Sequence, residues 1–378
     1  MSYQMKPDTR KIAVVFDALS VYSGAERVLE AVLELYPQAP IYTLVHNPGA
    51  FAGTSIADHK VHTSWIQNTP GSTLYYRNYL PLMPLTVEQF DLSGYDLVLS
   101  FSYAVAHGVL CRPDQLHISY TFAPLRYAWQ NAHEYFQKGP LSPISKIILH
   151  YIRFWDQTAT SQIDHLIAIS DWTAACIWRA YRREAEVIYP PVEIDRFKPL
   201  SPRSDYYVAF SRLVRHKRLE IIVQAFSKLG LPLIVIGEGP ERKSLEALAA
   251  PNIKLLGRQS DQAVAELVGR ARALVHAAEE DFGLVMAEAQ AAGCPVIAYG
   301  SGSSREIIVE GQTGLLFPEQ TVESVMDAVQ LFEQEAKSFS QTKAIKNARR
   351  FSKGRFQNQF DQMVERHWAS FTRKPKIR

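Results

Sequence analysis

Two glutamates stand eight residues apart, where their carboxylates are suited to bind the hydroxyl groups of a sugar. Glu280 follows the apolar run 273–278, which predicts a buried strand, and Glu288 lies on the helix predicted after Gly283. Open α/β sheets bind ligands at the carboxyl ends of their strands, and a helix N-terminus there favours a phosphate. Acids also occur at helix starts because they complement the helix dipole, so the pair alone leaves both interpretations open.

Two cations follow another predicted strand in the same way. The strand covers 206–210, and Arg212 and Lys217 come directly after it. Fixed cations at a strand end can bind a diphosphate, although exposed cations alone are unremarkable. Gly24 opens a predicted helix after the strand 12–16, but the Gly-x-Gly-x-x-Gly pattern of dinucleotide-binding folds is absent there. This absence argues against a dinucleotide-dependent dehydrogenase.

Strands and helices alternate along the chain, which predicts an α/β fold with parallel sheets. With 378 residues and 47% hydrophobic content, the chain has enough apolar material for two cores, and the proline-containing segment 187–197 predicts a linker. Its three cysteines are scattered and lack metal-ligand spacing, which favours a reducing compartment. The first apolar run is too short for a signal peptide, and no run spans a bilayer, so we expect a cytoplasmic protein.

The central stretch resembles the signature of the GT4 retaining glycosyltransferases, which have the GT-B fold. The match comprises Glu280 to Val285, Glu288 with Ala289, and Gly293 to Ile297. The resemblance extends over nearly the whole chain and is strongest over 206–316. It implies two Rossmann-like domains with an interdomain cleft and a C-terminal helix that crosses back to the first domain. The expected parts are an N-terminal acceptor-side domain over 1–192, a nucleotide-sugar-binding domain over 193–352 and the helix segment 353–378.

The resemblance also implies roles for single residues. Arg212 and Lys217 would bind the donor diphosphate, and with Glu280, which would orient the donor sugar, they form the expected catalytic set. Glu288 would bind the ribose and Arg258 the base. The remaining donor-site residues implied are Gly24, Phe282, Gly283, Leu284 and Val285. No Asp-x-Asp motif stands at a strand end, so we expect neither a metal nor any cofactor besides the nucleoside-diphosphate sugar.

The stretch 119–129 resembles bacterial GT4 mannosyltransferases that build O-antigen and capsule glycans. Arg126 matches that family, as do Tyr127 and Trp129, whereas Phe122 stands where the family has a histidine that lines the donor-sugar site. A phenylalanine side chain can neither accept a hydrogen bond nor move a proton. His107, near the end of the preceding strand, is an alternative. The candidates for the acceptor or sugar site are therefore Arg126, His107 and Phe122.

These features favour a retaining glycosyltransferase of polysaccharide biosynthesis that moves mannose from GDP-mannose to a glycan or lipid-linked acceptor. One alternative is a GT4 transferase that uses a UDP-sugar. Others, of a different class, are a GT-B epimerase and a sugar-nucleotide-binding protein impaired by Phe122.

Charge is unevenly distributed over a chain whose net charge is +3. From Lys343 onward there are eleven Lys or Arg against two acids, which indicates a solvated helix face or an anionic membrane surface. No nucleic-acid-binding pattern accompanies this basic tail. The aromatic loop 65–84 and the helix 144–155 are further membrane candidates, although packing in the core is the simpler explanation for both. We expect a cytoplasmic location, peripheral on the inner face of the cell membrane.

Overall fold

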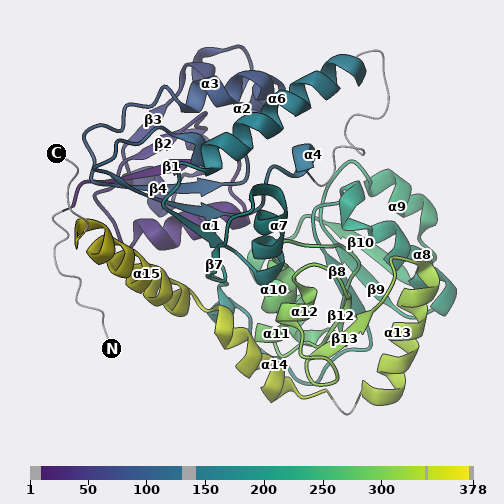
Figure 1. Cartoon of the computed structure of the whole chain (residues 1–378). Coiled ribbons are helices and arrows are strands. Elements are labelled where there is room, and N and C mark those ends of the chain that lie inside the picture. Colours follow the sequence, from purple (N-terminus) through teal and green to yellow (C-terminus); the bar gives the residue numbers. More distant parts are fainter. Residues whose placement is uncertain (1–9, 130–141, 337–338, 374–378) are drawn as a thin grey trace. The chain divides into compact units, whose positions relative to one another are not determined.

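The computed structural model describes residues 10–129, 142–336 and 339–373, which fall into two compact units (Figure 1). The first domain comprises residues 1–189 and 356–378, and the second comprises residues 190–355. The chain thus passes from one unit to the other between Tyr189 and Pro190, inside the segment expected to be a linker. It returns to the first unit within the last helix.

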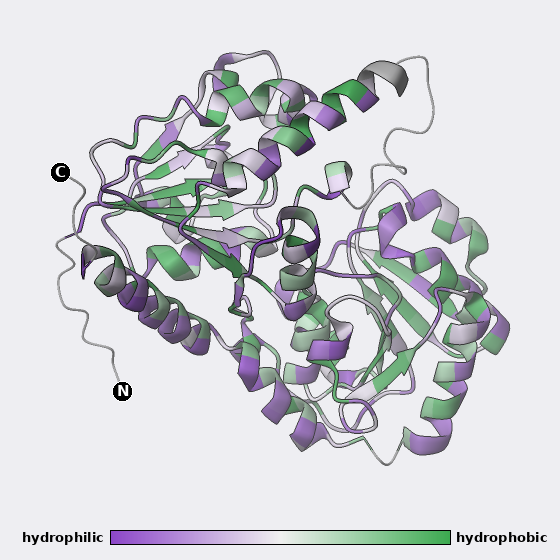
Figure 2. Cartoon of the chain, in the orientation of Figure 1, coloured by the Kyte–Doolittle hydropathy of each residue, from purple (hydrophilic) through white to green (hydrophobic). Residues whose placement is uncertain are grey.

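The first domain is built on a seven-stranded parallel sheet of order β3-β2-β1-β4-β5-β6-β7. Its three central strands are buried along their whole length and most of their residues are apolar, as a parallel sheet covered by helices on both faces requires. Figure 2 shows hydrophobic colours over much of this sheet, with paler and hydrophilic stretches among them. The strands are β1 Ile12–Phe16, β2 Ile41–Thr43, β3 Val61–Thr63, β4 Leu97–Ser102, β5 Leu116–Thr121, β6 His165–Ala168 and β7 Glu186–Val187.

Helices cover both faces of this sheet. The last helix packs on one face, where the rings of Phe356 and Phe360 lie 5.9 and 6.2 Å from that of Tyr120. The other face carries a core that includes residues of α3 and α6. The helices are α1 Gly24–Leu33, α2 Ser72–Tyr75, α3 Met83–Val87, α4 Arg126–Trp129, α6 Ser142–Thr160, α7 Asp171–Tyr181 and α15 Lys353–Arg373.

The second domain repeats the plan with a six-stranded parallel sheet of order β10-β9-β8-β11-β12-β13. Its strands are β8 Tyr207–Phe210, β9 Leu233–Ile236, β10 Ile253–Gly257, β11 Leu274–His276, β12 Val296–Tyr299 and β13 Gly314–Phe317. Its helices are α8 Leu219–Leu229, α9 Arg242–Leu248, α10 Asp261–Arg270, α11 Leu284–Ala291, α12 Ser304–Ile307, α13 Val322–Glu335 and α14 Gln341–Ala348.

Three local expectations need correction. Strand β7, whose Val187 falls in the segment expected to be a linker, pairs with β6 in the sheet. The aromatic loop is instead a series of short helices, α2, the 3-10 helix η4 (Tyr76–Leu82) and α3. The helix expected over 144–155 is longer and runs over Ser142–Thr160. Across the residues that the structure describes, none of the helices combines the length and apolar character needed to cross a bilayer.

Each sheet has one place where the strand order reverses, between β1 and β4 in the first domain and between β8 and β11 in the second. At such a topological switch point the connections after the two strands diverge to opposite faces, and ligands of open α/β sheets bind there. The segments after β8 and β11 carry the predicted cations and Glu280, and the segment after β1 leads to Gly24.

Candidate functional site

The cation-bearing segment after β8 is held in place by a glycine turn after β9. The Leu213 N–H donates to the Glu238 carbonyl at 2.9 Å, and the Glu241 N–H donates back to the Leu213 carbonyl at 3.1 Å. Cβ atoms at Gly237 and Gly239 would lie 1.9 and 2.2 Å from carbonyl oxygens of this segment. The close approach therefore requires glycine at both positions, and it fixes where the segment leaves the sheet.

Lys217 and Glu280 meet at the switch point of the second domain. Lys217 Nζ lies 2.5 Å from Glu280 Oε1, and His276 Nε2 lies 3.3 Å from the same oxygen. The Lys217 and Glu280 side chains keep 17% and 12% of their surfaces exposed, so the pair remains in contact with solvent. Burial raises the pKa of the Glu280 carboxyl, but Lys217 and His276 outweigh it and hold that pKa well below its usual range. Glu280 is therefore ionised and oriented.

The turn after β12 supports the loop that carries Glu280. The Ser303 N–H donates to the Glu280 carbonyl at 3.0 Å, and Ser303 Oγ accepts from the Gly283 N–H at 3.2 Å. Gly302 has a φ of +68°, and a Cβ there would lie 2.5 Å from the Glu280 oxygen. Any larger residue at 302 would displace the Glu280 backbone.

The predicted donor contacts 282–285 occupy the start of α11. The Phe282 side chain is buried and packs edge-on against Phe351 at 5.3 Å, so only its backbone remains for a ligand. Leu284 and Val285 form the half-buried first turn of the helix. A helix N-terminus favours an anion. That of α11 begins four residues after Glu280, on the connection that leaves β11 at the switch point.

Glu288 is buried on the second turn of α11 and has a cationic neighbour that the sequence analysis missed. Arg196 Nη2 lies 3.4 Å from Glu288 Oε1, and Arg196 Nη1 lies 2.6 Å from Asp261 Oδ2. Arg196 and Glu288 are 92 residues apart, so no local pattern reveals the pair. The other two predicted donor-site cations, Arg212 and Arg258, are exposed, and each directly follows the carboxyl end of a strand.

In the first domain, Gly24 begins α1, and Ser23 caps the helix. The Glu26 carboxylate accepts the Ser23 N–H at 2.8 Å and the Ser23 hydroxyl at 2.6 Å, which forms a capping box. Burial raises the pKa of the Glu26 carboxyl.

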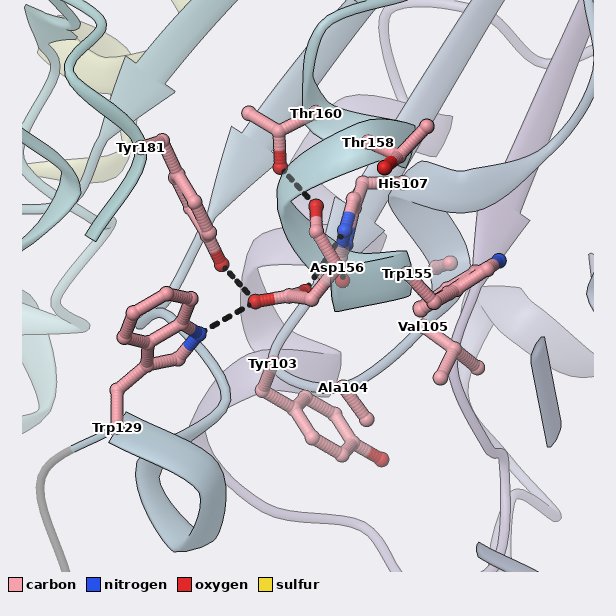
Figure 3. Close-up of polar contacts among 12 residues, drawn as sticks. Tyr103, Ala104, Val105, His107, Trp129, Trp155, Asp156, Thr158, Thr160 and Tyr181 are labelled. Atoms are coloured by element: carbon pink, nitrogen blue, oxygen red, sulfur yellow. Dashed lines mark hydrogen bonds and ion pairs between the residues drawn. The ribbon is translucent and has the colours of Figure 1, made fainter. Parts of the chain in front are cut away.

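His107 lies in the interior of the first domain. It follows β4, is 5% exposed, and its Nδ1 and Nε2 lie 2.9 Å from Ser102 Oγ and 3.1 Å from Asp156 Oδ1 (Figure 3). The expectation that it reaches a ligand in place of the missing histidine has no support in this geometry. Phe122 is half-buried at the end of β5, 5.5 Å from the ring of Tyr120, and Arg126 is half-buried at the start of α4.

Lys217, Glu280 and the start of α11 are therefore brought together at one switch point. Glu288 lies on the same helix, and Arg196, which ends the 3-10 helix η6 (Ile194–Arg196), pairs with it. The candidates His107, Phe122 and Arg126 belong to the other domain. His276, four residues before Glu280 at the end of β11, was missed although its place at a strand end was a usable signal. Within the described residues, no group of three His, Cys, Asp or Glu side chains is placed to hold a metal ion.

Comparison with known proteins identifies the second domain. Residues 192–351 match the family model of glycosyl transferases group 1. An uncharacterised glycosyltransferase of Methanocaldococcus jannaschii is 30% identical over 171 residues, which are 43% of this chain and 48% of that protein. A GDP-mannose-dependent alpha-(1-6)-phosphatidylinositol monomannoside mannosyltransferase of Mycobacterium tuberculosis is 29% identical over 219 residues, 50% of this chain and 55% of that protein. The chain spans about half the length of the curated relatives it matches.

The similarity in structure covers both domains. Sucrose-phosphate synthase from Thermosynechococcus elongatus superposes with a TM-score of 0.71 at 16% identity, covering 96% of this chain and all of that one. Two parallel-sheet, Rossmann-like domains in one chain, with the last helix packed on the first domain, constitute the GT-B fold expected from the sequence.

Proposed function

We propose that this chain, whose residues 192–351 form a glycosyl transferases group 1 domain, is a retaining glycosyltransferase that moves a sugar from a nucleoside-diphosphate donor to a glycan or lipid-linked acceptor. The observation that carries the proposal is the Lys217–Glu280 pair at the switch point between β8 and β11, with Arg212 exposed on the same segment as Lys217. A diphosphate and a sugar need this combination of cations and an ionised carboxylate.

The proposed chemistry is electrostatic. Negative charge grows on the diphosphate as the bond to the sugar breaks, and Arg212, Lys217 and the N-terminus of α11 stabilise it as fixed groups. The Lys217 ammonium has three N–H donors, so it can hold Glu280 and a phosphate together. Glu280 orients the sugar hydroxyls. In the account implied by the resemblance, the acceptor hydroxyl attacks the face from which the diphosphate departs, and the departing phosphate takes its proton.

Glu288 is proposed to bind the ribose. Its side chain is buried on α11, and its carboxylate pairs with the Arg196 guanidinium at 3.4 Å. Arg258 at the end of β10 is proposed to contact the base, and the first domain supplies the acceptor side with Arg126.

Two cations would bind the diphosphate without a metal, so we expect activity in EDTA to stay within about twofold of the untreated enzyme. A loss that magnesium or manganese restores would contradict metal independence.

GDP-mannose is the proposed donor. The support is the likeness of residues 119–129 to mannosyltransferases and the GDP-mannose dependence in the name of the mycobacterial relative. A UDP-sugar remains the second candidate, because Phe122 departs from the mannosyltransferase pattern at the sugar site.

A membrane-bound acceptor is supported by an apolar surface on the first domain. On α6, Ile147, Tyr151 and Phe154 recur at helical spacing with 70%, 47% and 69% of their surfaces exposed, and Lys146 is exposed beside them. Leu74 on α2 is 78% exposed and Leu85 on α3 is 53% exposed. Trp155 Nε1 joins α6 to Glu88, directly after α3, at 2.7 Å. Apolar side chains with cations beside them suit an anionic lipid surface.

The basic tail contributes less simply. Its cations divide between the two domains at residue 356, and Arg366 already pairs with Glu186 of the first domain. Lys374, Lys376 and Arg378 lie outside the described residues.

Liposome co-sedimentation at low and high salt, with anionic and neutral lipid, tests whether the apolar surface of the first domain and the basic tail bind a membrane. We expect the double variant Ile147→Glu/Phe154→Glu to lose binding, a chain ending before Arg373 to bind more weakly, and the control Leu331→Glu on α13 to bind normally. A full chain that ignores anionic liposomes at low salt would favour a soluble acceptor.

The donor is tested by binding. Calorimetric titration with GDP and with UDP, followed by transfer assays with GDP-mannose and UDP-sugars, should show one nucleotide bound more tightly by the wild type than by Lys217→Met. Lys228→Met is the matched control, because Lys228 is an exposed lysine of the same domain paired with Glu323 at 3.3 Å. Equal nucleotide affinity in all three proteins would overturn the site. Product analysis would reveal an epimerase, which releases no sugar to an acceptor.

A further inference from the structure

A buried carboxylate in the first domain has no part in the chemistry proposed above. Asp156 on α6 is fully buried. Its Oδ2 accepts from Trp129 Nε1 at 2.7 Å and from the Tyr181 hydroxyl at 2.8 Å, and its Oδ1 lies 3.1 Å from His107 Nε2 (Figure 3). We call Asp156, His107, Trp129 and Tyr181 the Asp156 cluster.

The Asp156 cluster fastens segments that follow three neighbouring strands. His107 lies in the short 3-10 helix after β4, Trp129 ends α4 after β5, and Tyr181 ends α7 after β6. These strands are adjacent in the sheet. One carboxylate thus ties together segments that follow three adjacent strands.

The helix that depends most on Asp156 is α4. It has four residues, too few for a helix to be stable alone, and α6 holds it by two contacts. One is the Trp129–Asp156 hydrogen bond, and the other runs from Arg153 Nη1 to the Ala128 carbonyl at 3.1 Å. A buried ionised group is rarely better for stability than an apolar one, whereas hydrogen bonds made to it fix the groups that donate them. Here Asp156 Oδ2 accepts both of its hydrogen bonds, one of them from α4.

We propose that Asp156 is a positioning residue that acts through Trp129, fixing α4 so that Arg126 is held ready for the acceptor. The proposal rests on the function proposed above, in which Arg126 lies on the acceptor side. It assigns Asp156 no contact with substrate and explains why a carboxylate without a catalytic role is buried beneath this helix.

Two variants remove matched hydrogen bonds from the same oxygen. Trp129→Phe removes the donor carried by α4, and Tyr181→Phe removes the donor carried by α7. We expect Trp129→Phe to raise the acceptor KM about tenfold, with the donor KM and the nucleotide affinity unchanged, because one charge-assisted hydrogen bond is lost. We expect the two variants to lower the melting temperature by similar amounts, because each loses one hydrogen bond to the same oxygen. Tyr181→Phe should nevertheless leave the acceptor KM within about twofold of the wild-type value. Equal kinetic effects of the two variants would show a merely structural role and overturn the proposal.

A double-mutant cycle and hydrogen exchange complete the test. Trp129→Phe should add little to the acceptor defect of Arg126→Ala, because both act through Arg126, and full additivity would contradict this. In hydrogen–deuterium exchange, Trp129→Phe should speed exchange of the peptide 122–129, and Tyr181→Phe should not. If the peptide exchanges at the same rate in Trp129→Phe as in the wild type, the positioning role is overturned, whether or not the chain transfers sugar. If the wild-type chain transfers no sugar but the peptide does exchange faster in Trp129→Phe, only the proposed function is refuted.

Discussion

The two domains share a fold but use a carboxylate at their switch points in opposite ways. In the first domain, Asp17 follows β1 and is 1% exposed. Its two oxygens accept four backbone N–H groups, those of residues 103–106 after β4, at 2.6 to 2.8 Å. In the second domain, Glu280 follows β11 and pairs with the side chains of Lys217 and His276, in contact with solvent.

The difference is consistent with the donor site proposed above at the second switch point. The chain itself fills every direction around Asp17, and burial raises the pKa of this carboxyl even though the four N–H groups lower it. Around Glu280 the partners are side chains, and a lysine side chain can turn part of its hydrogen bonding toward a phosphate. Asp17 is therefore a structural joint at the first switch point, whereas Glu280 belongs to the donor site proposed above.

Replacing Asp17 should produce the largest loss of stability. Asp17→Ala leaves four buried N–H groups without an acceptor, at a cost of about 1 kcal/mol or more each, so we expect a loss of about 4 kcal/mol or more in the free energy of unfolding. Asp96→Ala is the control, because Asp96 is an exposed residue of the same domain that accepts the Lys11 N–H at 2.8 Å. Urea unfolding measures both. Similar losses would mean that Asp17 is not the joint described here.

Replacing Lys217 should show the reverse, a large effect on transfer with little effect on folding. We expect Lys217→Met and Glu288→Gln each to lower the transfer rate at least about 100-fold, about 3 kcal/mol of transition-state stabilisation. Lys228→Met should transfer normally. Steady-state kinetics with circular dichroism as a folding control provide the measurement. Near-normal turnover in both site variants would remove the distinction between the two switch points.

The fold was largely predictable because the signals that build it are local. The apolar runs that became β1, β4, β8 and β11 predict buried strands from a handful of adjacent residues. The failures are elements whose existence depends on distant partners. Strand β7 has two residues and exists because β6 lies beside it, and the short helices of residues 72–87 contain two prolines that masked their helical character.

The site divides along the same line. Glu280, Lys217 and the start of α11 were predictable because the resembled family repeats their spacing and each stands at a strand end. Asp17 and its acceptor role were not, because its N–H partners lie 86 to 89 residues away. The contact between Arg196 and Glu288 was not predictable for the same reason. Nor was the position of His107 in the domain interior, because its partner Asp156 lies 49 residues farther along the chain.

Lowering the pH should destabilise the first domain before the second. Burial, helped by the nearby charges of His107 and Arg183, lowers the pKa of His117 in the first domain to about 3. The unfolded chain takes up this proton below the ordinary pKa of about 6.5, so stability falls as the pH drops from there toward 3, by about 2 kcal/mol at pH 5. The pKa of Glu280 is lowered, so its stabilisation is intact above about 4.5 and is lost only below. Hydrogen exchange at pH 7 and pH 5, corrected for intrinsic rates, should show weaker protection in the first domain only. His117→Gln should reduce that difference, and equal losses in both domains would contradict this assignment.

The smallest expected effect concerns two arginines held at a φ of +55°, Arg182 after α7 in the first domain and Arg218 before α8 in the second. An L-residue in this left-handed region costs about 1 kcal/mol or more, whereas glycine there adds freedom to the unfolded chain worth about 0.4–1 kcal/mol. Arg182→Gly should therefore raise stability by less than about 1 kcal/mol, a shift of about 2 °C in the melting temperature. Arg218→Gly should gain less, because it also removes the exposed pair between Arg218 Nε and Glu220 Oε1 at 3.3 Å. Calorimetry with and without nucleotide separates strain from binding. Unchanged nucleotide affinity in Arg218→Gly would mean that the arginine takes no part in binding, and weaker affinity would make it a third cation of the proposed diphosphate site.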